Sequence, residues 1–133
     1  MDNPQKRSTG QWILQGFVVE PGGWHFKPPT DVIELEDRLV ILVEIAGMDA
    51  ESFNIVTHNR DLVISGTRRR TALENPAFHQ AEIGFGAFRL QVQLPWRADP
   101  QTISAQYDNG FLRIDLPRQT ERQILITDNP SGD

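Results

Sequence analysis

Three histidines, His25, His58 and His79, are the side chains of this sequence best suited to metal binding or to proton transfer near neutral pH. They fall in three different segments, and none is accompanied by Glu or Asp at the short helical spacings that metal sites use. The chain contains no cysteine, which excludes disulfides, thiol catalysis and cysteine-based zinc or iron–sulfur sites. We therefore expect no metal site.

Hydrolytic chemistry would need paired acids or an activated nucleophile. Glu34 and Glu36 would share one face of a strand, as the two carboxyls of a glycosidase could. That face opposes the apolar one formed by Ile33 and Leu35, so we expect both acids to meet solvent. Ser65 lacks the Gly-x-Ser-x-Gly elbow, and no helix follows it. We expect no catalytic residue, and we expect that the chain is not an enzyme.

Binding of phosphate or nucleic acid is equally unsupported. Residues 84–86 read Gly-Phe-Gly, but Arg89 stands where a dinucleotide loop would place its third glycine, and no helix follows. A structural turn without a cofactor is the better interpretation. The formal net charge of -5 repels nucleic acid, and we expect the basic run 68–70 to be a solvated loop.

The elements that would position these side chains are strands. Of the 133 residues, 38% are hydrophobic and 23% are charged, a balance typical of one folded domain with arms. Alternating apolar residues predict strands from Asp31 and over 39–43, 53–57, 62–66, 88–94, 103–107 and 112–116. Asn109 and Gly110 mark the hairpin turn between the last two. We expect an all-β fold, a two-layer antiparallel β-sandwich of the immunoglobulin-like kind, with flexible arms.

The predicted domain spans residues 30–117 and lies between an arm of residues 1–29 and a tail of residues 118–133. The arm is too apolar for an inert linker: it either folds back on its own domain or packs between subunits or against client proteins. Its large apolar residues are Trp12, Ile13, Leu14, Phe17, Trp24 and Phe26. The first three are too few for a signal peptide or a membrane span, so we expect a cytoplasmic protein.

Several segments, taken in order, resemble the small heat-shock protein family and its α-crystallin domain. They are residues 31–34 (Asp-Val-Ile-Glu), 44–48 (Glu-Ile-Ala-Gly-Met), 62–68 (Leu-Val-Ile-Ser-Gly-Thr-Arg), 86–88 (Gly-Ala-Phe) and Leu94-Pro95. Residues 105–112 (Ala-Gln-Tyr-Asp-Asn-Gly-Phe-Leu) are similar to the Ala-x-x-x-Asn-Gly-Val-Leu signature of that family, with Phe111 in place of Val. The resemblance covers about residues 28–117.

The resemblance implies contacts between copies of the chain. Ile124 and Ile126 match the C-terminal Ile-x-Ile motif, which in the family docks into the sandwich edge of a neighbour. The receiving groove would lie between the strand of Phe53 and Ile55 and the strand of Ile103 and Ala105. Bacterial and plant-type members also form dimers by exchanging a short strand in the long loop. Here that strand would be residues 77–80, with Phe78 and His79.

One position departs from the family pattern. Family members often carry Arg two residues beyond the Phe that aligns with Phe88, whereas this chain has Leu90 there and Arg89 one position earlier. Because adjacent strand residues face opposite sides, Arg89 cannot replace the family arginine.

The resemblance implies an ATP-independent chaperone of the stress response, a holdase that binds partly unfolded proteins and prevents their aggregation. Its partners would be itself, as a dynamic oligomer built from dimers, and its clients, with no nucleic acid and no membrane span. The alternative is a monomeric co-chaperone adaptor of the CS-domain kind, which the Ile-Leu-Ile tail disfavours. A ligand-binding sandwich would need a ring of exposed aromatics, and Trp96 alone is too little for one.

Overall fold

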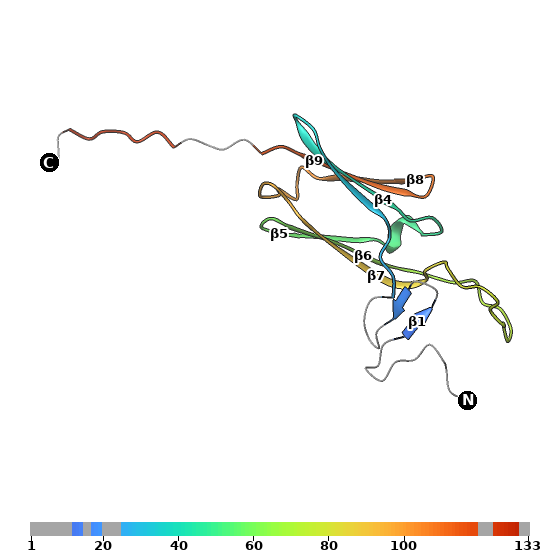
Figure 1. The fold of residues 1–133 in the computed structure, drawn as a ribbon. Helices are drawn as coiled ribbons and strands as arrows, with labels where there is room; N and C mark the ends of the chain where they lie inside the picture. Colours follow the sequence, from blue (N-terminus) through green and yellow to red (C-terminus); the bar gives the residue numbers. More distant parts are fainter. Residues whose placement is uncertain (1–11, 15–16, 20–24, 120–123, 131–133) are drawn as a thin grey trace.

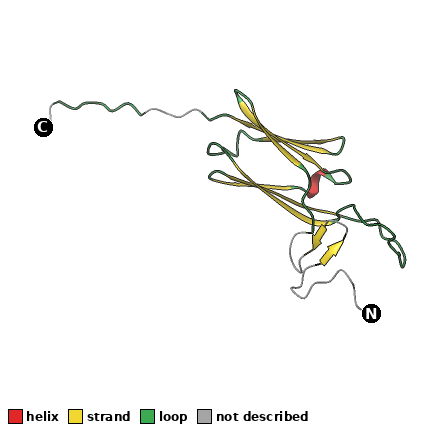
Figure 2. Ribbon diagram, in the orientation of Figure 1, coloured by secondary structure: helices red, strands yellow, loops and turns green. Residues whose placement is uncertain are grey.

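The computed structural model describes residues 12–14, 17–19, 25–119 and 124–130. Two antiparallel sheets pack face to face as a sandwich, which confirms the predicted fold (Figures 1 and 2). One sheet has the strand order β3-β4-β9-β8, and the other has the order β5-β6-β7. Their bounds are β3 (Thr30–Glu34), β4 (Arg38–Glu44), β5 (Asn54–His58), β6 (Asp61–Arg68), β7 (Gly86–Gln93), β8 (Ser104–Asp108) and β9 (Phe111–Pro117). A short 3-10 helix, η1 (Ala50–Ser52), precedes β5.

The core lies between the two sheets. Phe88, Leu90, Val92 and Leu94 are buried, as the alternation of β7 predicts. They meet the inward side chains of the opposite sheet, which are Leu39, Ile41, Val43, Leu112, Ile114 and Leu116. Each buried aliphatic or aromatic side chain contributes about 1.5–3 kcal/mol to folding before entropy costs, so this layer is the main stabilising term of the sandwich.

Tight turns set the strand register. Asn109 and Gly110 have φ angles of 50° and 81°, and they join β8 to β9 so that Asp108 pairs with Phe111. Two positive φ values match a type I′ turn, which follows the twist of the flanking strands. Asn59, at φ 56°, turns the chain between β5 and β6. Both predicted hairpins are confirmed.

The two sheets leave four edge strands, and these form two seams. Strands β3 and β7 border one seam of the sandwich, and β5 and β8 border the other. An edge strand presents unpaired backbone N–H and C=O groups along its free side. Each seam therefore offers both backbone and apolar side chains to a partner.

Strand β3 corrects one prediction. Ile33 and Leu35 do not enter the core but keep 38% and 37% of their surface exposed, and Val32, on the other face, lines a cavity and is 48% exposed. The sequence pattern of this strand is alternating, but its position at the edge leaves both faces partly open, so the alternation does not identify the core face. Glu34 meets solvent, as expected.

The N-terminal segment contains two short strands, where the sequence predicted no regular element. Strand β1 (Trp12–Leu14) pairs with β2 (Phe17–Val19) in an antiparallel hairpin. Phe26 is buried at 8% exposure and contacts Phe88 at a ring distance of 5.6 Å. Of the two alternatives for the arm, Phe26 follows the first: it folds back and fills its own sandwich core near the start of β7.

Candidate functional site

The predicted groove exists at the seam between β5 and β8. One cavity of about 460 Å³ and an adjoining one of about 210 Å³ share Ile55 and Ala105 in their walls. The first is also lined by Val56, Thr57, Pro100 and Ile103, and the second by Ala50, Phe53, Gln106, Tyr107 and Leu112. The structure thus brings together all four residues that the sequence analysis placed here.

The floor of this groove is anchored in the core. The Phe53 ring lies 6.2 Å from the Phe88 ring and 5.1 Å from the Tyr107 ring. The Tyr107 hydroxyl donates a hydrogen bond of 2.7 Å to the Ile45 carbonyl and accepts one of 3.3 Å from the Met48 amide. The groove is therefore preformed by groups that also hold the two sheets together.

The chemistry of the groove suits an extended apolar peptide. Its lining contains no charged residue, and both flanking strands are sheet edges with free backbone groups. Extended peptides bind to such edges through main-chain hydrogen bonds, while alternate side chains fill pockets. A segment with apolar residues two positions apart meets this requirement.

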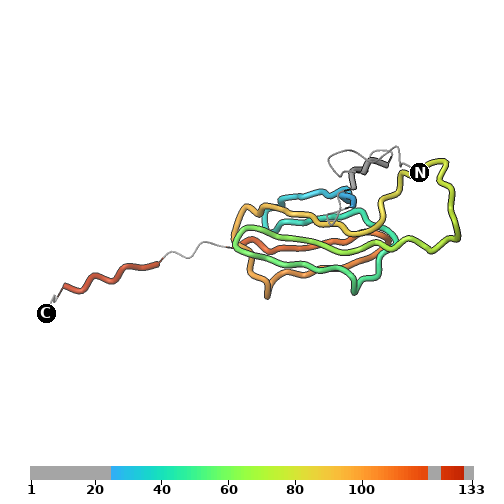
Figure 3. The backbone as a smooth tube through the Cα atoms, turned by 90° about the horizontal axis from the view of Figure 1, so that it is seen from below, coloured from blue at the N-terminus to red at the C-terminus, as the bar shows by residue number. Residues whose placement is uncertain are grey.

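The C-terminal tail carries such a segment. Ile124, Leu125 and Ile126 are exposed at 84%, 86% and 94%. The described part of the tail extends away from the sandwich (Figures 1 and 3). Because Ile124 and Ile126 are two residues apart, an extended conformation places both side chains on one face. The structure does not bring them to the groove of their own chain.

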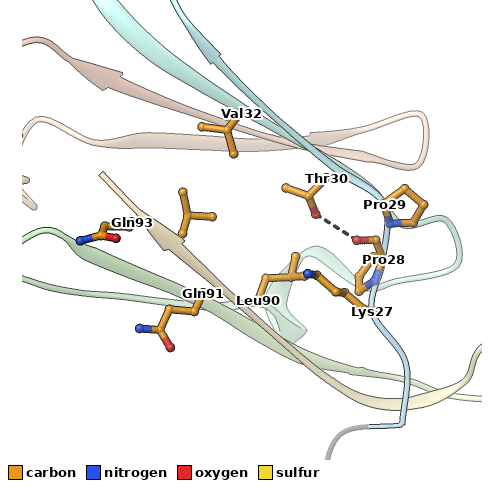
Figure 4. A pocket seen from close by; sticks show the side chains of 9 residues that line it. Lys27, Pro28, Pro29, Thr30, Val32, Leu90, Gln91 and Gln93 are labelled. Carbon is orange, nitrogen blue, oxygen red and sulfur yellow. Dashed lines mark hydrogen bonds between the residues drawn. The ribbon is translucent and has the colours of Figure 1, made fainter. Parts of the chain in front are cut away.

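A third cavity, of about 470 Å³, lies at the seam between β3 and β7 (Figure 4). It is lined by Lys27, Pro28, Pro29, Thr30, Val32, Leu90, Gln91, Val92 and Gln93. Leu90, at the position of the family arginine, is buried, while Arg89 is exposed on the opposite face and bonds to Gln91 at 3.3 Å. Leu90 and Val32 make part of this lining apolar, and Lys27 is its charged residue. The sequence analysis missed the cavity, because part of its wall is the segment 27–30, which leads from Phe26 beside β7 to the start of β3.

The long loop of residues 69–85 joins β6 to β7 and extends beyond the end of the sandwich (Figure 3). Phe78 is 52% exposed, and His79 is exposed as well. Leu73 and Ile83 add exposed apolar surface, at 63% and 65%. Residues 77–80 form no strand in the single chain, so the predicted short strand is not present as an element of its own. A strand forms only when a neighbouring strand accepts its hydrogen bonds.

Arg68 attaches this loop to the sandwich, and Arg70 packs against two aromatic rings within the loop. Arg68 donates to the Gly84 carbonyl from Nε at 2.8 Å, and its guanidinium lies 4.6 Å from the centre of the Phe26 ring. Burial lowers the pKa of Arg68, although an arginine remains charged at neutral pH. Arg70 lies 4.7 Å from the Phe78 ring and 4.3 Å from the Phe85 ring. The expectation of a fully solvated basic run is wrong for Arg68, since the aromatic neighbours come from distant segments.

His25 and His58 do not line any of these three cavities. His58 contacts its neighbour Asn59 at 3.3 Å, and the main chain of His25 bonds to Ala87 at 2.7 Å. Within the described ranges, no three His, Asp or Glu side chains are grouped as metal ligands, and no helix is long and apolar enough to cross a bilayer. Trp12, Ile13, Leu14 and Phe17 lie in β1 and β2, and Trp24 lies outside the described residues.

A sandwich of four and three strands, with a hydrophobic groove at one seam and an Ile-x-Ile tail, defines the α-crystallin class of domain. The profile of the Hsp20/alpha crystallin family matches residues 31–127, and the chain belongs to this family. It is 36% identical over 93 residues to the 17.7 kDa class II heat shock protein of Arabidopsis thaliana, a match covering 68% of this chain and 60% of the plant protein. The chain spans about three fifths of the length of the bacterial and plant relatives it matches.

Solved structures share the fold. Heat shock protein 16.0 from Schizosaccharomyces pombe superposes with a TM-score of 0.63 at 28% identity, covering 77% of this chain and 99% of that one. A small heat-shock protein from Xylella fastidiosa superposes with a TM-score of 0.60 at 26% identity, covering 76% and 96%. The Xylella protein is described as having a distinct high order structure.

Proposed function

We propose that this protein is an ATP-independent chaperone that holds partly unfolded proteins and prevents their aggregation, and that it works as a dynamic oligomer built from dimers. The observation that carries the proposal is the presence, in one chain, of an exposed Ile124 and Ile126 and of an uncharged groove between β5 and β8. Membership of the Hsp20/alpha crystallin family and the high-order assembly of the Xylella relative support it.

Docking of the tail into a neighbouring chain is a weak contact taken singly. Burying two isoleucine side chains contributes about 3–6 kcal/mol before ordering costs, and a millimolar dissociation constant corresponds to about 4 kcal/mol. Two tails on one dimer act at effective concentrations of order millimolar. A closed assembly is then stable while its individual contacts open, and subunits exchange.

The dimer uses the other seam. Strand β3 has a free edge beside the cavity that Val32 and Leu90 help to line, and the long loop of residues 69–85 extends beyond its own sandwich (Figures 3 and 4). Residues 77–80 of one copy pair with the β3 edge of the second copy, which completes the strand that the single chain does not form. With Leu90 at the family arginine position, Leu90 contributes an apolar contact to this interface where an ion pair could otherwise form, and Lys27 is the charged residue of the cavity.

Client proteins bind to the apolar surface that these contacts cover. When heating opens tail contacts, the groove at β5 and β8 becomes available to chains that expose their own core residues. The strands β1 and β2, which contain Trp12 and Phe17, provide a second apolar segment. Holding a client in this way requires no nucleotide.

The test compares the mass in solution of the intact chain with that of Ile124→Ala/Ile126→Ala, by light scattering. The matched control is Leu125→Ala, because residue 125 faces the opposite side of the extended segment. We expect light scattering to show a large assembly for the intact chain and for the control, and dimers for the double variant. We also expect the intact chain to suppress the heat-induced aggregation of a model client. A monomer without protection would instead indicate an adaptor of the CS-domain kind.

A further inference from the structure

Arg118 is the first residue after β9, at the root of the C-terminal tail, and it is bonded to the turn between β3 and β4. Its backbone amide donates to the Asp37 carbonyl at 2.9 Å. Its side chain donates from Nε to the Glu36 carbonyl at 2.8 Å and from Nη2 to the Leu35 carbonyl at 3.1 Å. Three successive carbonyl groups of one turn are therefore held by one residue.

The Arg118 side chain also contacts an acid of β3 and an aromatic ring that follows β7. Nη2 lies 3.4 Å from the Glu34 carboxylate, and the guanidinium lies 4.7 Å from the centre of the Trp96 ring. Trp96 is 9% exposed and follows β7, in the three-stranded sheet. Arg118 thus joins the edge strand β3, the connection after β7 and the end of β9. An exposed ion pair alone is worth little, but five contacts from one residue fix its orientation.

A planar guanidinium is required for this arrangement. Its donors point in fixed directions within one plane while its face stacks on an aromatic ring. A lysine ammonium carries a similar charge, but it cannot bond two carbonyls and stack on an indole at the same time. The next residue, Gln119, contacts the Thr102 hydroxyl at 3.5 Å and continues the same course. The described main chain at residues 118–119 is therefore held in a defined direction where it leaves β9.

We propose that Arg118 is a positioning residue that sets the angle at which the tail leaves the sandwich, and so selects the second copy whose groove the tail reaches. This inference rests on the proposed docking of the tail. From residue 118 to Ile124 a fully extended chain spans at most about 20 Å. Because the connection is short, rotation at its root moves the Ile-x-Ile motif by a comparable distance. Linked contacts are lost when geometry forbids simultaneous engagement, so the angle controls the number of subunits in a closed assembly.

The tail direction is measured by pulsed electron spin resonance. The chain has no cysteine, so Asn54→Cys and Thr127→Cys provide two unique sites for spin labels. Residue 54 is an exposed position of β5, and residue 127 is an exposed position of the tail. The measurement uses the Ile124→Ala/Ile126→Ala chain, diluted with unlabelled copies, so that no docking contributes. We expect a defined maximum in the distance distribution, which Arg118→Ala shifts and broadens. Arg118→Lys should give an intermediate width.

The matched control is Arg113→Ala, which removes the same charge from β9 but breaks only the pair with Asp115. It should leave the distribution unchanged. Thermal unfolding of every variant verifies that the sandwich remains folded. If Arg118→Ala leaves the distance distribution as it was, the inference is overturned, whatever the state of assembly.

Assembly mass is then compared in chains with an intact tail. We expect a narrow mass distribution for the intact chain and a broader one for Arg118→Ala. Arg113→Ala should keep the narrow distribution. A broadened tail distribution with unchanged mass would also overturn the inference. If the intact chain proves not to assemble through its tail, the proposed function fails in its own test, and the spin labels still decide whether Arg118 sets the tail direction.

Discussion

Tyr107, on edge strand β8, donates a hydrogen bond of 2.7 Å to the carbonyl oxygen of Ile45. Ile45 follows β4 and is fully buried. The Tyr107 ring also lies against Phe53, which precedes β5 in the other sheet. One side chain therefore lines the groove at β5 and β8 and satisfies a carbonyl at its base, so the shape of the groove and the stability of the sandwich are linked.

Removal of the Tyr107 hydroxyl should destabilise the sandwich but leave the aromatic ring in the wall of the groove. In Tyr107→Phe the Ile45 carbonyl and the Met48 amide lose their partner, which costs about 1–3 kcal/mol for partly buried groups. The ring contact with Phe53 is retained. Urea unfolding in the assembly-defective Ile124→Ala/Ile126→Ala chain measures the loss, and an unchanged free energy of unfolding would contradict this role.

A charge in the groove should prevent assembly. Ala105→Glu places a carboxylate in the walls of both cavities, where a docked isoleucine would have to bury it. We expect dimers by light scattering, as for loss of the tail motif. Ser104→Glu is the matched control, because residue 104 is exposed and its side chain faces the opposite side of β8. Equal effects of the two variants would show that the groove is not the docking site.

Gly110 should be needed for the hairpin between β8 and β9. Its φ angle is 81°, and a Cβ atom there would lie 3.3 Å from the Cβ of Ala46. A left-handed conformation costs other residues about 1–2 kcal/mol, so Gly110→Ala should lower the free energy of unfolding by at least this amount. Asn109→Gly, at φ 50°, is the control and should be tolerated. Thermal and urea unfolding compare the two, and equal stability would contradict the turn assignment.

The β3 edge should carry the dimer contact. Val32 points into the cavity that Leu90 also lines (Figure 4). Val32→Asp therefore puts a charge in the proposed interface, and it should convert dimers of the Ile124→Ala/Ile126→Ala chain to monomers. Ile33→Asp is the control on the outer face of the same strand and should remain dimeric. Analytical ultracentrifugation separates the two states. Dimers that persist in Val32→Asp would exclude this edge.

Asp115 should contribute stability that depends on pH. Hydrogen bonds from Arg113, at 3.0 and 3.1 Å, together with the nearby Arg38, lower the pKa of Asp115 below its ordinary value. The folded state therefore binds this proton less tightly than the unfolded state. The contribution is present above the unfolded pKa of about 3.9 and is lost as the pH falls through the lower folded value. NMR titration of the Asp115 carboxyl should show the depressed pKa, and Arg113→Ala should raise it.

Much of the fold follows from local pattern. Phe88, Leu90 and Val92 alternate in a strand that is buried on one face, and the Asn-Gly turn needs only the conformational preferences of its own two residues. The groove residues were also predictable, since Phe53, Ile55, Ile103 and Ala105 occupy family positions whose strands become neighbours. The surroundings of Arg68 could not be predicted, because Phe26 and Gly84 are remote in sequence.

The sequence by itself determined the two-sheet sandwich, the hairpin at Asn109 and the paired isoleucines of the tail, because these depend on residue alternation and on local backbone preference. Only the tertiary structure decided that Phe26 enters the core, that Ile33 stays partly exposed and that Arg118 is bonded to the β3–β4 turn. The physical reason is that strand order sets which faces are covered. A strand of the same alternation is buried in the middle of a sheet and half exposed at its edge.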